Sequence, residues 1–218
     1  MSKSGSGQET TQRRLWRSLR ARFAPPPIDS IEGLETFLEE RAALIAQKCA
    51  IDYCRGKTGL ASYALFTEAP FLKALDVCRW ETFAAVLGDL IIITEGNLRQ
   101  TASPSQRAQL RDRLATLYAT VLGRMPAPEH RPQGWADAVA SFAKRMEKTG
   151  SAAAALTRDV ADHSAKRLFD TLPIHSSMRA LDEEVVYGAV RFRMTAVSQE
   201  MQRRLIAAKL VEQLIGAS

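Results

Sequence analysis

The sequence predicts an all-α fold: a single helical domain of six or seven helices, preceded by a flexible, basic, amphipathic N-terminal arm. Three observations lead to this prediction. Apolar residues make up 46% of the 218 residues and aromatic residues only 7%, so alanine and aliphatic side chains supply most of the apolar mass, as in packed helices. Apolar residues recur three and four positions apart in most segments. No segment shows the strict apolar–polar alternation of a half-buried strand.

The arm is expected to comprise residues 1–27 and the helical domain residues 28–218. Residues 1–10 are polar and rich in serine and glycine, which is typical of a flexible segment. Three consecutive prolines at 25–27 cannot continue a helix and predict a stiff spacer. The arm holds six basic residues and one acid, Glu9, and therefore carries +5 of the total net charge of +6. The basic character belongs to the arm rather than to the domain.

Residues 11–24 of the arm are predicted to form an amphipathic helix. At about 100° per residue, the apolar and the cationic side chains fall on different sides of such a helix. The side chains concerned are Leu15, Trp16, Leu19 and Phe23 on the apolar side, Arg13, Arg14, Arg17 and Arg20 on the basic side, and Arg22 at the edge. A helix of this kind binds an anionic membrane surface or a protein groove. Nucleic-acid binding is disfavoured because it leaves the apolar side without a role.

The first helix of the domain is predicted from its two ends. Asp29 and Glu32 have the spacing of a capping box. The helix is expected to end near Arg55, with Gly56 as a left-handed cap. The stretch Gly56-Lys57-Thr58 resembles the end of a phosphate-binding loop. We interpret it as a helix end because Ile51 stands where such a loop needs its first glycine, and because the preceding segment is predicted to be helical rather than a strand.

The central helix is predicted to follow a short helical segment at 60–67. Pro70 is tolerated in the first turn of this long helix. The helix is apolar on nearly all sides between Phe83 and Ile93, which is typical of a helix in the middle of a bundle. The next helix is expected to begin at Ser103, where a serine cap is followed by proline and, three positions on, by Gln106.

The second half of the domain is expected to hold three more helices. A proline-containing loop, 125–134, separates the preceding helix from helices at 135–149 and 151–170. The last helix is predicted to start at a cap formed by Ser176 or Ser177 and to run to about Ile215. Gly188 is the candidate position for a bend in it. This long C-terminal helix is also a candidate face for a homodimer.

A pocket among the helices would indicate an enzyme or a binder of a small apolar ligand. The residues that we expect around such a pocket are Trp80, Phe83, Asp89, Trp135, Phe142 and His163. Asp89 lies on an apolar helix, where a buried carboxylate either pairs with an arginine or acquires a raised pKa. We favour the pairing. The sequence shows no nucleophile elbow, dinucleotide fingerprint or catalytic triad, so an enzyme is less favoured than a binding protein.

No metal site and no cofactor are predicted. The three histidines lack the spacing of a zinc or di-iron site. Asp159 and His163, four residues apart, are interpreted as a pair on a helix surface. The odd number of cysteines, Cys49, Cys54 and Cys78, predicts buried, reduced thiols rather than disulfides.

The leading hypothesis is an intracellular accessory or interaction protein that residues 11–24 attach to an anionic membrane surface, leaving the domain free to bind a protein partner. No stretch reaches the roughly 20 apolar residues that span a bilayer, and no apolar signal segment follows the basic residues. We therefore expect a cytoplasmic protein, peripheral at the membrane. An arginine-rich, acid-poor N-terminus also resembles an organellar transit peptide, and that alternative stays open.

Overall fold

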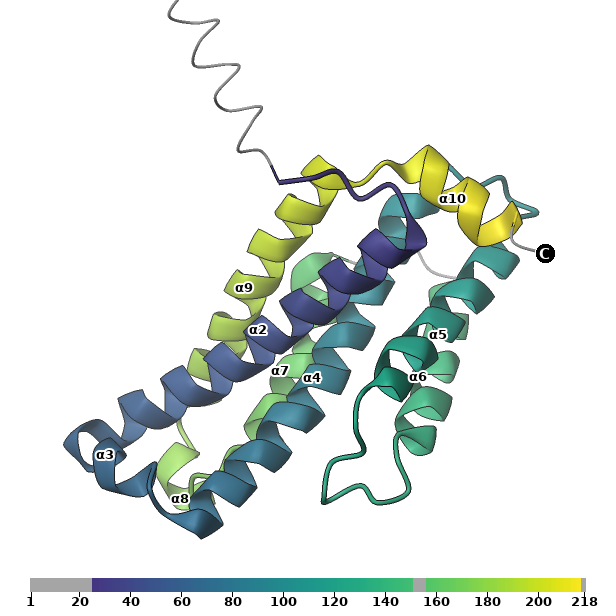
Figure 1. Ribbon diagram of the computed structural model, residues 1–218. Helices are drawn as coiled ribbons and strands as arrows, with labels where there is room; N and C mark the ends of the chain where they lie inside the picture. Colours follow the sequence, from purple (N-terminus) through teal and green to yellow (C-terminus); the bar gives the residue numbers. More distant parts are fainter. Residues whose placement is uncertain (1–24, 151–155, 217–218) are drawn as a thin grey trace, which may run out of the picture.

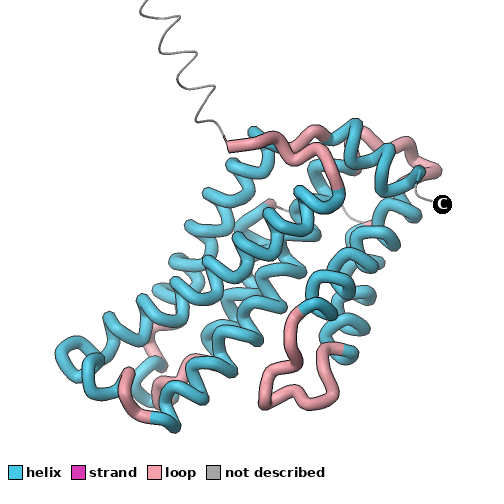
Figure 2. The backbone as a smooth tube through the Cα atoms, viewed as in Figure 1, coloured by secondary structure: helices cyan, strands magenta, loops and turns pink. Residues whose placement is uncertain are grey.

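The computed structural model describes residues 25–150 and 156–216 of the chain, and most of these residues are helical. Long helices run side by side along the bundle in Figure 1, and Figure 2 shows the described residues as helices, loops and turns. No strand occurs in the described residues, where a parallel bridge between Ile28 and Leu205 is the nearest approach to a sheet. The predicted all-α class is confirmed.

The described residues contain more helices than the six or seven predicted, so that number is wrong. In chain order the elements are α2 (Ile31–Thr58), the 3-10 turn η1 (Gly59–Ala61), α3 (Ser62–Leu65), α4 (Ala69–Leu98), α5 (Arg107–Arg124), α6 (Ala136–Thr149), α7 (Thr157–Thr171), α8 (Ser176–Arg179), α9 (Glu183–Arg204) and α10 (Ala207–Gly216).

The predicted last helix is divided because the chain leaves helical geometry at Leu205 to pair with the start of the domain. The amide of Ile28 donates to the carbonyl of Arg204 at 2.8 Å, and the amide of Ile206 donates to the carbonyl of Ile28 at 2.9 Å. The helix therefore breaks at Leu205, whereas Gly188 lies inside an uninterrupted α9. The predicted serine cap is also wrong, because His175 precedes the short helix α8 and α9 starts after Asp182.

The ends of α2 differ from the prediction by one to three residues. Ser30 rather than Asp29 caps the helix, since its hydroxyl oxygen accepts the amide of Gly33 at 3.1 Å. At the other end the helix continues to Thr58, and Gly59, with φ of 53°, follows it. Gly56 stays inside the helix. A left-handed conformation suits glycine because a Cβ atom would be strained there.

The start of α5 is also later than predicted. The segment from Ser103 to Gln106 forms turns, in which the side-chain oxygen of Gln106 accepts the amide of Ser103 at 3.0 Å. The helix begins only at Arg107. Pro70 lies in the first turn of α4, as predicted.

The long helix α4 lies at the centre of the fold, as its apolar sequence predicted. It packs against α2, α5, α6, α7, α9 and α10. Every residue from Glu81 to Ile91 is buried. Because this stretch includes Glu81 and Asp89, the fold must provide partners for carboxylates inside its core.

Replacing Leu90 by alanine is expected to lower the free energy of unfolding by about 2–5 kcal/mol, because the side chain is fully buried and its removal leaves a cavity. Leu60→Ala is the matched control, since Leu60 is fully exposed. Urea unfolding followed by circular dichroism measures both. Equal, small losses in the two variants would show that α4 does not form the core.

Candidate functional site

A cavity of about 220 Å³ opens to solvent between α4, α6 and α7. The rings of Tyr118 and Phe142 form an aromatic part of its wall and stack with their centroids 4.2 Å apart. The charged part of the wall consists of Glu81, Arg131, Asp137, Arg145, His163 and Arg167. The cavity is therefore apolar on one side and ionic on the other.

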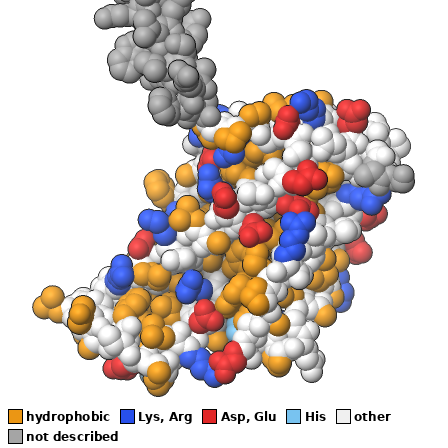
Figure 3. Space-filling view, viewed as in Figure 1, with side chains coloured by type: hydrophobic (Ala, Val, Ile, Leu, Met, Phe, Trp, Pro, Cys, Tyr) orange, Lys and Arg blue, Asp and Glu red, His pale blue; other side chains and the backbone are white. Residues whose placement is uncertain are grey.

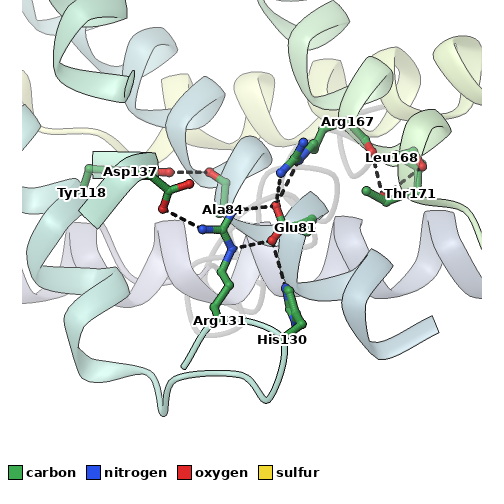
Figure 4. A network of polar contacts seen from close by, with 9 residues as sticks. All are labelled: Glu81, Ala84, Tyr118, His130, Arg131, Asp137, Arg167, Leu168 and Thr171. Atoms are coloured by element: carbon green, nitrogen blue, oxygen red, sulfur yellow. Dashed lines mark hydrogen bonds and ion pairs between the residues drawn. The ribbon is translucent and has the colours of Figure 1, made fainter. Parts of the chain in front are cut away.

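Glu81 is the centre of the ionic side. Its carboxylate accepts hydrogen bonds from Arg131 of the loop before α6 and from Arg167 of α7, with Nη2 of Arg131 and Nε of Arg167 each at 3.0 Å. His130 Nε2 lies 2.9 Å from the same carboxylate. Figure 4 shows Arg131 between Glu81 and Asp137, with Arg167 approaching from the other side. Three segments distant in sequence thus meet at one buried acid.

The partners of Glu81 keep it ionised. Burial raises the pKa of this carboxyl group, but the hydrogen bonds from Arg131, Arg167 and His130 outweigh burial and lower the pKa to about 2. An acid that holds its proton this weakly does not serve as a proton donor near neutral pH. The geometry fits a structural counter-charge.

Asp89, eight residues further along α4, is fully buried and paired with Arg145 of α6. One carboxylate oxygen accepts from Arg145 Nη2 at 2.6 Å, and the other accepts from the amide of Ser164 at 3.0 Å. His163 Nδ1 lies 3.5 Å from Asp89 and 2.9 Å from Arg145 Nη1. The arginine pairing that the sequence favours is therefore present. Nothing in this arrangement supports acid–base catalysis by Asp89.

The six residues expected around one pocket do not share one cavity. Phe142 and His163 line the 220 Å³ cavity, and Asp89 lies behind its wall, against His163. Trp80 and Phe83 line a different hollow, of about 200 Å³, next to α2. Trp135 is buried and packs against Trp80, with ring centroids 6.4 Å apart. Because α4 is buried on all sides between Glu81 and Ile91, its side chains there face separate neighbours.

Sequence reasoning missed the residues that form the ionic cluster: Glu81, His130, Arg131 and Arg167. A signal for Glu81 was present, because it is an acid within the same apolar helix as Asp89. The partners had no such signal. An arginine in a loop or on an amphipathic helix is normally exposed.

The other predicted features divide between described and undescribed residues. The nine arm residues predicted to contact a membrane or partner lie outside the described ranges.

The expected pair of Asp159 with His163 is wrong: Asp159 contacts Arg158, while His163 contacts Arg145 and Asp89. Residues 25–150 and 156–216 contain no group of three or more potential metal-binding side chains, and no helix in these ranges combines the length and hydrophobicity needed to cross a bilayer.

The three cysteines are free and buried, as predicted. Burial raises the pKa of Cys49 and of Cys78 to about 11 and that of Cys54 to about 12. Thiols that ionise so weakly are poor nucleophiles and poor metal ligands.

A second candidate site is an exposed apolar surface at one end of the bundle, which we call the distal surface. It consists of Leu60, Tyr63, Met178 and Leu181, whose exposed fractions are 101%, 88%, 52% and 95%. Leu60 and Tyr63 come from η1 and α3, whereas Met178 and Leu181 come from α8 and the turn after it. The contact between Lys57 and Asp182, at 2.6 Å, holds these two segments together. Figure 1 places α3 and α8 at this end, and Figure 3 shows hydrophobic side chains gathered there.

The sequence matches no protein-family model, and no curated protein or solved structure is significantly similar to it. Functional conclusions therefore depend on the residues and geometry of this chain.

Replacing Glu81 by glutamine is expected to cost about 3–5 kcal/mol of stability, since Arg131 and Arg167 lose their shared buried counter-charge. Glu129→Gln is the matched control, because Glu129 forms an exposed pair with Lys73; no measurable change is expected for it.

The same pair of variants tests the pH dependence. The folded-state pKa of Glu81, about 2, lies below its ordinary value of 4.5. Its contribution to stability is therefore present above pH 4.5 and is lost as the pH falls towards 2. Urea unfolding at several pH values should show this acid-dependent loss in the wild type and in Glu129→Gln but a smaller one in Glu81→Gln. Parallel pH profiles for all three proteins would contradict the assignment.

Proposed function

We propose that this protein is an intracellular interaction protein that acts at an anionic membrane surface. Residues 11–24 attach it to the lipid, and the helical domain binds a protein partner. The distal surface is the observation that carries the proposal. Large apolar side chains gathered on a protein surface mark interaction sites more often than single exposed ones do.

The position of the junction between the arm and the domain supports separate sites for lipid binding and partner binding. Ile28 is fixed by its hydrogen bonds to Arg204 and Ile206, and the guanidinium of Arg204 also donates to the carbonyl of Pro26 at 2.9 Å. This junction lies at the end of α9, and the distal surface lies at its start (Figure 1). At 1.5 Å per residue, α9 separates the two by about 30 Å. Lipid binding and partner binding therefore use different ends of the domain.

A second candidate function is the binding of a small anion in the cavity. His163 and Arg167 line the cavity with side chains that are 49% and 44% exposed. An arginine only donates hydrogen bonds, so Nδ1 of neutral His163 accepts from Arg145 and the ring carries its proton on Nε2. That N–H and the guanidinium of Arg167 suit a carboxylate or phosphate oxygen.

Calorimetric titration of the protein with inorganic phosphate and with benzoate tests this second candidate. We expect binding to weaken in His163→Ala, which removes an exposed donor while Asp89 keeps its hydrogen bonds from Arg145 and from the amide of Ser164. An unchanged affinity in this variant, or no heat with either anion, would remove the cavity from consideration as an anion site.

The membrane part of the proposal is tested by co-sedimentation of the full chain and of a 25–218 truncation with neutral and anionic vesicles. We expect only the full chain to bind, and only to anionic vesicles, because each basic residue near such a surface contributes about 1 kcal/mol. The thermal melt of the truncation should match that of the full chain. Equal binding by both proteins, or none by either, would contradict the attachment.

The partner part is tested on the same anionic vesicles by comparing the proteins recovered with the wild type and with a Leu60→Glu, Tyr63→Glu variant. We expect the variant to lose specific partners that the wild type retains, because two charges interrupt the distal surface. Leu44→Glu is the control, since Leu44 is a half-exposed leucine of α2 outside that surface. Identical recovery with all three proteins would show that the distal surface has no role.

A further inference from the structure

The helix α9 is apolar on two sides. Its inner side contributes Val186, Val190, Met194, Val197 and Met201 to the core. Its outer side carries a second row, which we call the α9 stripe: Val185, Gly188, Phe192 and Ala196. These residues follow one another at intervals of three and four, so they share one helix face. Val185 and Phe192 are 64% and 75% exposed, and α9 runs along an edge of the bundle in Figure 1.

Neither a left-handed backbone nor a close contact within its own chain requires glycine at Gly188, in the middle of the α9 stripe. It lies in the interior of an uninterrupted helix, its backbone conformation is not left-handed, and a Cβ atom built on it would meet nothing within 4 Å. Gly88 of α4 differs, because a Cβ atom there would approach Phe142 to 3.0 Å. Glycine destabilises a helix interior relative to alanine. An exposed glycine that the fold does not need suits the close approach of a second helix.

The charges beside the α9 stripe are complementary to those of a second, antiparallel copy. Glu184 precedes Gly188 by four residues and Arg191 follows it by three, and both lie on the same flank of the stripe, where they contact each other at 3.3 Å. When two such helices pack antiparallel about Gly188, Glu184 of each copy lies beside Arg191 of the other. In a parallel pair, identical positions lie side by side along the seam. Only the antiparallel arrangement brings opposite charges of the two copies together on this flank, where Arg191 also contacts Asp162 of its own chain at 2.6 Å.

We propose that two copies of this protein associate through α9, packed antiparallel and centred on Gly188. Val185 of one copy then contacts Phe192 of the other, twice by symmetry. The arm is a poorer occupant of the stripe, because it is strongly basic and the second half of α9 carries Arg191, Arg193 and Arg203. The inference goes beyond the proposed function, since it holds whether or not the distal surface binds another protein.

The pairing has a consequence for membrane attachment. Each arm joins its domain at the end of α9, so an antiparallel pair carries its two arms at opposite ends. Two arms on one particle bind a vesicle more tightly than one arm does, because the second binding event is intramolecular.

Sedimentation of the full-length protein over a wide concentration range tests the association. We expect a dimer whose dissociation constant rises roughly tenfold or more in Phe192→Glu and in Gly188→Leu. Gly123→Leu is the matched control, because Gly123 is also a helix glycine with nothing within 4 Å of a Cβ position. A monomer at all concentrations, or a dimer that Gly188→Leu and Phe192→Glu leave unchanged, overturns the proposal.

Disulfide crosslinking tests the orientation, since the native cysteines are buried. Mild oxidation of a mixture of the full-length Val185→Cys and Phe192→Cys proteins should give mainly the mixed dimer. Crosslinking of Val185→Cys to itself as the main product would show a parallel pair and overturn the antiparallel assignment. Neither result bears on the distal surface, whose test uses Leu60 and Tyr63, so the two proposals fail independently.

Discussion

The arrangement of this fold depends on carboxylates buried in its central helix. Glu81, Asp89 and Glu95 all belong to α4 and are at most 7% exposed. A buried carboxylate without a partner costs several kcal/mol, so each needs a cation from a specific direction. Glu81 pairs with Arg131 and Arg167 from outside the helix, and Asp89 pairs with Arg145 of α6. Glu95 pairs with Arg99, the residue that follows α4. The positions of α6, α7 and the loop before α6 are thereby tied to α4.

This constraint separates the interior of the protein from the surfaces for which we propose binding. The acids that resemble catalytic groups in the sequence are occupied by arginines, and the cavity between α4, α6 and α7 is what remains beside their side chains. The candidate binding regions lie on the surface of the domain. They are the distal surface at one end, the α9 stripe along one edge, and the junction with the arm at the other end. The pairing of these buried acids with arginines, together with the apolar side chains exposed on the surface, supports our proposal that the helical domain binds a protein partner.

The sequence predicted the features that depend on neighbouring residues in the chain. It did not predict the features that depend on contacts between distant segments. The apolar run from Phe83 to Ile93 identified the central helix, and an isolated acid in that run identified Asp89 as buried. The break at Leu205 had no local signal, because it depends on pairing with Ile28 at the other end of the domain. The arginine partners were unpredictable for the same reason, since Arg131 meets Glu81 across 50 residues of chain. The residues expected around one pocket line separate hollows, because α4 is buried on every side between Glu81 and Ile91. The periodicity of the sequence shows that this stretch is buried, but it does not show which neighbour each side chain contacts.

The most direct test of this account is a double-mutant cycle between Asp89 and Arg145, measured by urea unfolding. Arg145→Met leaves a fully buried carboxylate without its cation, and we expect it to cost about 3–5 kcal/mol. The double variant with Asp89→Asn should lose less than the sum of the single losses, by about 1–3 kcal/mol, because no uncompensated charge stays in the core. Strictly additive losses would contradict the account, since they would mean that the buried acids of α4 do not hold the surrounding helices through their arginines.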